Sequence, residues 1–280
     1  MNGTITVGVT GAAVVDRAVD WAIARAVERR QRIELLSVVG GVLGAVGEDA
    51  VLADAVALTR ASVERHADKA RAAGVEVNVR VESGNPVSVL IQASEASALL
   101  VIGSDYQGPG TGRARGAHGV RIAAGARCPV VVVPDLDLHD RRGVVVGVDG
   151  SEVSEQALRF AAEEADRLGE PLIAVSVWTP LHAPRNDLAV YPELYLTNMQ
   201  SATEEILSLA LAGLASDHPD LEIVRRVERG YPSHVLNEIA ATARLTVVGT
   251  HGRGAVARFL LGSISQEVLS RLASVTAVVR

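Results

Sequence analysis

Lysine is almost missing from this sequence, and its scarcity excludes one common way of binding a nucleotide. Lys69 is the single lysine among 280 residues, and it follows Asp68 rather than a glycine. A Walker A phosphate loop needs a lysine directly after its last glycine, where the ammonium group reaches the phosphates. The chain therefore has no Walker A loop.

Cysteine, aromatic residues and net positive charge are also scarce. The one cysteine, Cys128, excludes an internal disulfide and a cysteine-rich zinc site. It precedes Pro129 and a valine run, which predicts a buried core thiol. Aromatic residues make up 3% of the chain, which argues against broad stacking surfaces for bases or sugars. The formal net charge of −6 argues against general nucleic-acid binding.

Long apolar runs are absent too. No stretch reaches the roughly 18 apolar residues of a membrane helix, and the opening MNGTITVGVTG lacks the basic region of a signal peptide. We therefore expect a cytoplasmic protein that does not act on membranes. Hydrophobic residues still make up 48% of the chain, enough for buried cores, and a prior of roughly 150 residues per domain predicts two domains.

Two copies of one unit follow each other along the chain. The segment VGVTGAAVVDRAVDWA at 7–22 matches VGVDGSEVSEQALRFA at 146–161, and VESGNPVSVL at 81–90 matches VERGYPSHVL at 227–236. A fixed repeat of this kind indicates a duplicated structural unit. We predict an N-terminal domain over 1–134, a polar linker over 135–142 and a C-terminal domain over 143–280.

Within each copy, short valine-rich runs alternate with amphipathic helical patterns. This alternation predicts a parallel sheet with helices on both faces, and five strands make a small doubly wound α/β domain. In the second copy the expected helices include 152–168, 202–215 and 232–243. The expected strands there are 144–148, 172–177, 221–227, 245–248 and 273–279.

A glycine-rich stretch, GTHGRGAVARFLLGS at 249–263, follows the fourth strand of the second copy. Ligands of doubly wound sheets bind at this end of the strands. Part of the stretch, Gly252-Arg-Gly-Ala-Val-Ala257, fits the dinucleotide fingerprint G-x-G-x-x-A. The next strand, however, ends in Arg280 instead of an acidic residue that could hold a ribose. We treat that fit as incidental.

The spacing of the glycines over the whole stretch suits a nucleotide better than the dinucleotide fingerprint does. Gly249 and Gly252 let the loop backbone pass close beneath a ribose and phosphates. Gly262 and Ser263 begin a helix whose N–H groups form an anion site, and the hydroxyls of Ser263 and Ser265 can donate to phosphate oxygens. Asp149 ends the first strand, where it can accept from an adenine amino group and repel a guanine keto oxygen. As an open alternative, Asp149 only forms a turn and helix cap with Ser151.

This glycine spacing, the strand ending in Val146-Gly-Val-Asp149 and the duplication together resemble the ATP-binding, tandem form of the universal stress protein family. The resemblance implies two tandem, Rossmann-like domains of the adenine nucleotide alpha hydrolase-like fold, with ATP, alone or with Mg²⁺, in the second. The implied adenine contacts are Gly147, Val148, Asp149 and Val177. The implied ribose and phosphate contacts are Val248, Gly249, Gly252, Gly262, Ser263, Ile264 and Ser265. Arg253 and His251 lie in the same loop, where they can face the phosphates.

The first copy lacks most of this site. Five positions change from the second copy to the first: Asp149 to Thr10, Gly252 to Tyr106, Ser263 to Ala117, Ile264 to His118 and Ser265 to Gly119. We expect the Tyr106 ring to intrude where backbone clearance is needed. The prediction is therefore one nucleotide per chain and a mainly structural first domain. Weak anion binding by the glycine- and arginine-rich segment 108–115 of the first copy stays an open alternative.

The resemblance implies a nucleotide-dependent regulator or sensor in the stress response, with an unidentified protein partner. Two alternatives stay open: a slow ATPase or autophosphorylating enzyme using Ser263 or Ser265, and a dimerisation module. The chain contains no HExxH or GxSxG motif and no evident magnesium-binding carboxylate pair. Family members pair through the last strand, so we expect strands 130–133 and 276–279 to pair within the chain, leaving other faces for a homodimer.

Overall fold

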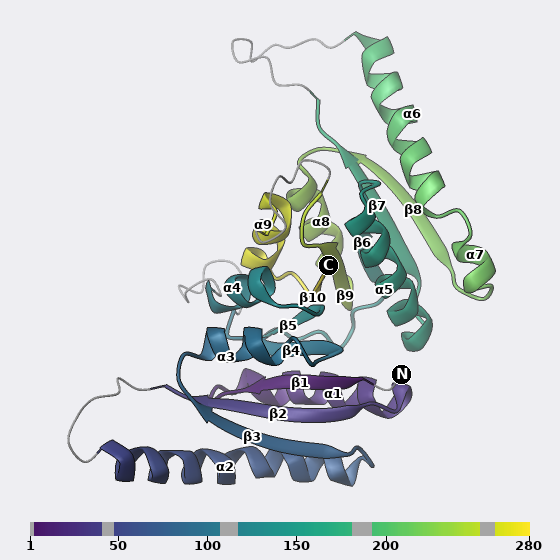
Figure 1. Ribbon diagram of the computed structural model, residues 1–280. Coiled ribbons are helices and arrows are strands. Elements are labelled where there is room, and N and C mark those ends of the chain that lie inside the picture. Colours follow the sequence, from purple (N-terminus) through teal and green to yellow (C-terminus); the bar gives the residue numbers. More distant parts are fainter. Residues whose placement is uncertain (1–2, 41–47, 107–116, 181–191, 253–260) are drawn as a thin grey trace. The chain divides into compact units, whose positions relative to one another are not determined.

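The computed structural model describes residues 3–40, 48–106, 117–180, 192–252 and 261–280. The chain forms two compact units, Met1–Asp137 and Leu138–Arg280. The division between them falls inside the polar stretch 135–142. Each unit is described separately below, and Figure 1 labels the elements of both.

Unit 1 is a five-stranded parallel sheet with helices on both faces. The strand order is β3-β2-β1-β4-β5, and its strand pairs are parallel. Its elements are β1 (Thr4–Val9), α1 (Val14–Arg29), β2 (Arg32–Val39), α2 (Glu48–Ala72), β3 (Val77–Ser83), α3 (Pro86–Ala93), β4 (Leu99–Ser104), α4 (Ala117–Gly125) and β5 (Val130–Pro134).

Unit 2 repeats this order as β8-β7-β6-β9-β10, again with parallel pairs. The two sheets confirm the predicted doubly wound α/β class. The elements are β6 (Val144–Gly147), α5 (Glu152–Leu168), β7 (Leu172–Trp178), α6 (Glu193–Ala210), α7 (Leu214–Asp217), β8 (Ile223–Arg229), α8 (Pro232–Ala240), β9 (Leu245–Gly249), α9 (Ser263–Arg271) and β10 (Val275–Val279).

The strand order reverses at β1 in unit 1 and at β6 in unit 2. β1 lies between β2 and β4, and β6 lies between β7 and β9. Their alternating connections leave a crevice beyond the carboxyl ends of these strands, which is where doubly wound sheets bind ligands. The central strands β1 and β4 are nearly fully buried, as expected for continuous apolar runs covered on both faces.

Two helices differ from their predicted extents. The helix predicted over 232–243 ends at Ala240, three residues early. The pattern predicts a helix over 202–215, whereas α6 begins after Pro192 and ends at Ala210. Gly213 then adopts φ 89°, a left-handed conformation that glycine reaches without steric cost, and the short α7 follows. Across the described ranges, no helix combines the length and the apolarity that crossing a bilayer requires.

Candidate functional site

Unit 2 holds a cavity of about 150 Å³ at the carboxyl ends of β6, β7 and β9. Nine of the twelve predicted site residues line it: Gly147, Val148, Asp149, Val177, Val248, Gly249, Gly252, Ile264 and Ser265. Gly262 and Ser263 lie just outside the lining, at the start of α9. Arg253 falls outside the described residues.

Asp149 uses one carboxylate oxygen to organise the turn into α5. Its Oδ1 accepts from the Ser151 backbone N–H at 2.9 Å and from the Ser151 hydroxyl at 2.6 Å. Ser151 in turn caps α5 by accepting from the Ser154 N–H at 3.2 Å. The alternative in which Asp149 forms a turn and helix cap with Ser151 therefore accounts for Oδ1.

The other carboxylate oxygen, Oδ2, faces the backbone of Gly252. A Cβ added at Gly252 would fall on Oδ2, far inside van der Waals contact. The Asp149 carboxylate and the Gly252 backbone thus lie against each other at the cavity wall. A side chain at position 252 would require this carboxylate, which Ser151 holds through Oδ1, to move.

Gly249 has a different reason to be glycine. We expected it to clear space for a ribose, but a Cβ there would lie 2.8 Å from Val153 Cγ1 on α5. Its counterpart Gly103 shows the same relation in unit 1, where a Cβ would lie 2.9 Å from Val14 Cγ1 on α1. Both glycines therefore let a helix pack closely on its sheet, and they do so in both units.

The start of α9 closes one end of the cavity. Gly262 donates its N–H to the Thr250 carbonyl at 2.7 Å, and a Cβ at Gly262 would lie 3.2 Å from His251 Cα. Gly262 is the N-cap and supplies no side-chain hydrogen bond, and the first helical bond runs from Gln266 N–H. Among the described residues, no acceptor meets the N–H groups of 263–265, which leaves them for an anion.

The two serines of this helix start are placed differently. Ser265 is buried and donates its hydroxyl to the Gly249 carbonyl at 2.6 Å, which fastens α9 to the end of β9. Ser263 is exposed at the first helical position. His251 also lines the cavity, with its Nδ1 3.0 Å from the Thr250 hydroxyl.

Sequence reasoning missed four lining residues: Ser154, Val175, Pro232 and Leu236. Pro232 and Leu236 belong to the duplicated segment VERGYPSHVL, whose counterparts Pro86 and Leu90 line the equivalent place in unit 1. That repeated proline and leucine, lying beside the switch point in both copies, was the signal available in the sequence.

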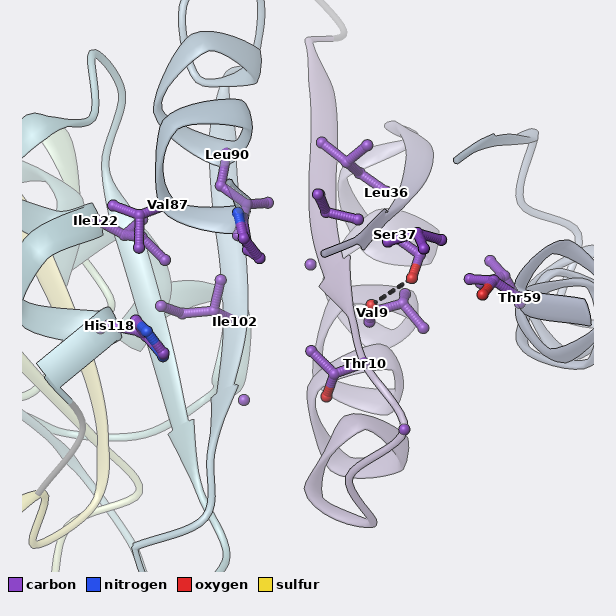
Figure 2. A pocket seen from close by; sticks show the side chains of 18 of the residues that line it. Val9, Thr10, Leu36, Ser37, Thr59, Val87, Leu90, Ile102, His118 and Ile122 are labelled. Atoms are coloured by element: carbon purple, nitrogen blue, oxygen red, sulfur yellow. Dashed lines mark hydrogen bonds between the residues drawn. The ribbon is translucent and has the colours of Figure 1, made fainter. Parts of the chain in front are cut away.

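Unit 1 has a cavity at the equivalent position, and it is larger, about 420 Å³. It lies at the carboxyl ends of β1, β2 and β4, bordered by α2, α3 and α4 (Figure 2). Thr10, His118 and Gly119 occupy the positions of Asp149, Ile264 and Ser265. Tyr106 is buried and does not line this cavity, so the intrusion expected of its ring is not seen among the described residues.

Metal binding has little support in the described ranges. They contain no group of three or more His, Cys, Asp or Glu side chains placed to hold a metal ion. In unit 2 the described cavity lining contains a single carboxylate, that of Asp149.

These features define a tandem α/β protein with a ligand crevice at the switch point of each unit. The sequence profile of the Universal stress protein family matches residues 1–134 and 141–280. A universal stress protein of Mycolicibacterium smegmatis is 31% identical over 290 aligned residues, covering 99% of this chain and 96% of that protein. One of Mycobacterium tuberculosis is 31% identical over 284 residues, covering 95% and 92%. The chain belongs to the universal stress protein family.

The fold is also that of a solved member. The crystal structure of a universal stress protein from Archaeoglobus fulgidus superimposes with a TM-score of 0.71 at 19% identity, covering 100% of this chain and 97% of the other. This agreement extends over both units, which confirms the tandem form that the duplicated sequence indicated.

Proposed function

We propose that unit 2 binds one adenine nucleotide, ATP, and that nucleotide occupancy regulates the interactions of this universal stress protein. The observation that carries the proposal is the pairing of two features at one cavity: the Asp149 carboxylate and the unpaired N-terminus of α9. One accepts hydrogen bonds from a base and the other attracts an anion, and an adenine nucleotide contains both partners.

The size of the cavity supports a position for the base in its interior. Small-molecule sites usually measure about 300–1,000 Å³, and this one measures about 150 Å³. That volume suits a purine ring packed between Val148, Val177 and Leu236, with the ribose and phosphates at the mouth. Asp149 Oδ2 would accept from the adenine amino group, whereas a guanine keto oxygen would meet it with like partial charge.

The phosphates would lie over the first turn of α9. Three N–H groups that meet no acceptor among the described residues, together with the positive end of the helix dipole, favour an anion there. Because the Ser265 hydroxyl is already donated to the Gly249 carbonyl, Ser263 is the serine that we expect to reach a phosphate. Mg²⁺, where present, would accompany the phosphates rather than a protein cluster.

The regulatory role rests on family membership and on what this site contains. The described lining offers one carboxylate and one histidine, and that histidine is hydrogen-bonded to its neighbour Thr250. No observation favours the slow ATPase or autophosphorylating enzyme over a binding protein. The protein partner, the cytoplasmic location and any homodimer are parts of the proposal and await their own measurements.

Asp149→Asn tests the proposal more sharply than removal of the side chain. The Asn Oδ1 can still accept from Ser151, so the turn is kept, while an NH₂ donor replaces Oδ2. ATP affinity should fall about 10- to 150-fold, corresponding to the roughly 1.5–3 kcal/mol of a hydrogen bond to a charged group. The affinity for GTP should rise relative to that for ATP, because the guanine keto oxygen can accept a hydrogen bond from the new NH₂ donor.

Isothermal titration calorimetry of the full chain measures both effects and the stoichiometry, expected to be one ATP per chain. Asp149→Ala is the comparison variant, since it removes the turn as well as the base contact. If Asp149→Asn binds ATP as tightly as the wild type, the carboxylate acts only in the turn and the assignment of adenine to this cavity is wrong.

A further inference from the structure

The cavity of unit 1 has no part in the proposed nucleotide site. It measures about 420 Å³ against about 150 Å³ in unit 2, and it falls within the range of about 300–1,000 Å³ usual for small-molecule sites. Part of the added room arises at Gly119, which stands where unit 2 has Ser265. A Cβ at Gly119 would have its nearest neighbour, Ile102 Cδ1, at 3.8 Å, so the space beside it is open.

The walls of this cavity are mostly apolar. In Figure 2, Val87, Leu90, Ile102 and Ile122 line one side, and Val9 and Leu36 line the other. These side chains come from three strands and two helices of unit 1. Such a surface favours a ligand that removes much apolar area from water.

A few polar groups interrupt the apolar walls. The hydroxyls of Thr10, Ser37, Thr59 and Ser62 and the ring of His118 complete the polar part of the lining. Ser37 is only 5% exposed and donates to the Val9 carbonyl at 2.8 Å, so its oxygen retains the capacity to accept. Among the described lining residues there is no Asp, Glu, Lys or Arg.

We propose that unit 1 binds an uncharged, largely apolar small molecule that carries one or two hydrogen-bonding groups. The apolar walls favour an apolar ligand. Thr10 stands where unit 2 has Asp149, so the carboxylate proposed to accept from adenine has no counterpart among the described lining residues. The two units would then hold ligands of different chemistry, and this inference does not depend on nucleotide binding in unit 2.

N-phenyl-1-naphthylamine is a suitable probe, because it is neutral, apolar and carries a single N–H donor. It is titrated into the full chain while its fluorescence is followed. We expect saturable binding of one probe per chain, unchanged by a saturating concentration of ATP.

Two variants fill the cavity from opposite walls. Gly119→Leu enters from α4, where leucine is also the better helix former, and Thr59→Leu enters from α2. Each should weaken probe binding about tenfold or more. Arg121→Leu is the matched control, since it places the same side chain on the exposed side of α4, and it should leave binding unchanged.

Three results would each overturn the proposal. The absence of saturable probe binding would mean that the cavity does not admit such a ligand. Equal binding by the filling variants and the control would place the probe elsewhere. Displacement of the probe by ATP would make this cavity a nucleotide site. Having two filling variants on different helices means that misfolding of one does not obscure the result.

Discussion

Units 1 and 2 share a fold and a crevice but have cavities of opposite character. The cavity of unit 1 is wide and has no Asp, Glu, Lys or Arg among its described lining residues, whereas the smaller cavity of unit 2 contains the carboxylate of Asp149. Duplication preserved the strand order and the position of the crevice. It did not preserve the side chains at the rim, which the fold does not need.

Glycines show the same division between what the fold needs and what a site needs. Gly103 and Gly249 are present in both copies because a helix packs against each of them. Gly252 is matched by Tyr106, since only unit 2 brings a carboxylate against the loop at that point. A glycine present in both copies is therefore explained by helix packing, and a glycine present in unit 2 alone is explained by the proposed site.

The largest effect, a loss of ATP affinity, is expected when Gly252 is replaced. Gly252→Tyr places in unit 2 the residue that unit 1 has, and its Cβ would displace the Asp149 carboxylate. ATP affinity should fall by more than about 100-fold, with the thermal transition of the chain nearly unchanged because Gly252 is exposed. Calorimetric titration with ATP measures the loss.

Gly11→Ala is the control for that exchange. Gly11 borders the unit 1 cavity and has no heavy atom within 4 Å of its Cβ position, so ATP binding should not change. Retention of wild-type ATP affinity by Gly252→Tyr would show that the loop does not lie against the nucleotide.

A smaller effect, on folding alone, is expected at the shared glycines. Gly103→Ala and Gly249→Ala each push a methyl group against a valine of the neighbouring helix. Overpacking of this kind costs about 1–3 kcal/mol of the free energy of unfolding, and the two losses should be similar. Urea unfolding of the full chain measures them. A loss at Gly249 alone would mean that this glycine serves the site rather than the fold.

The smallest effect concerns the start of the first helix in each unit. Ser151 caps α5 with its side chain, whereas the N-cap of α1 is Ala13, which forms no side-chain hydrogen bond. Ser151→Ala should lower the free energy of unfolding by about 1 kcal/mol, and Ser151→Thr, which keeps the hydroxyl, should lower it much less. If both variants unfold like the wild type, the cap does not contribute to the stability of unit 2.

Sequence reasoning selected most of the residues that line the unit 2 cavity, but for some of them the structure shows a packing or hydrogen-bonding role that the sequence did not predict. Asp149, Gly252, Ile264 and Ser265 do line one cavity, because strand ends of a parallel sheet meet at one edge whatever their separation in the chain. Gly249 serves the packing of α5, and the Ser265 hydroxyl holds the loop. These roles depend on which atoms of distant elements come into contact. Residue type and spacing do not predict those contacts.

By itself, the sequence determined the duplicated unit, the five parallel strands of each copy and the sheet edge at which the cavities lie. Those features follow from local apolar periodicity and from a repeated order of elements, both readable along the chain. Only the tertiary structure decided that Asp149 meets Gly252, that Tyr106 stays out of the crevice and that unit 1 contains the larger cavity. Cavity shape is what remains after side chains from several elements have packed together, so it exists only in the folded unit.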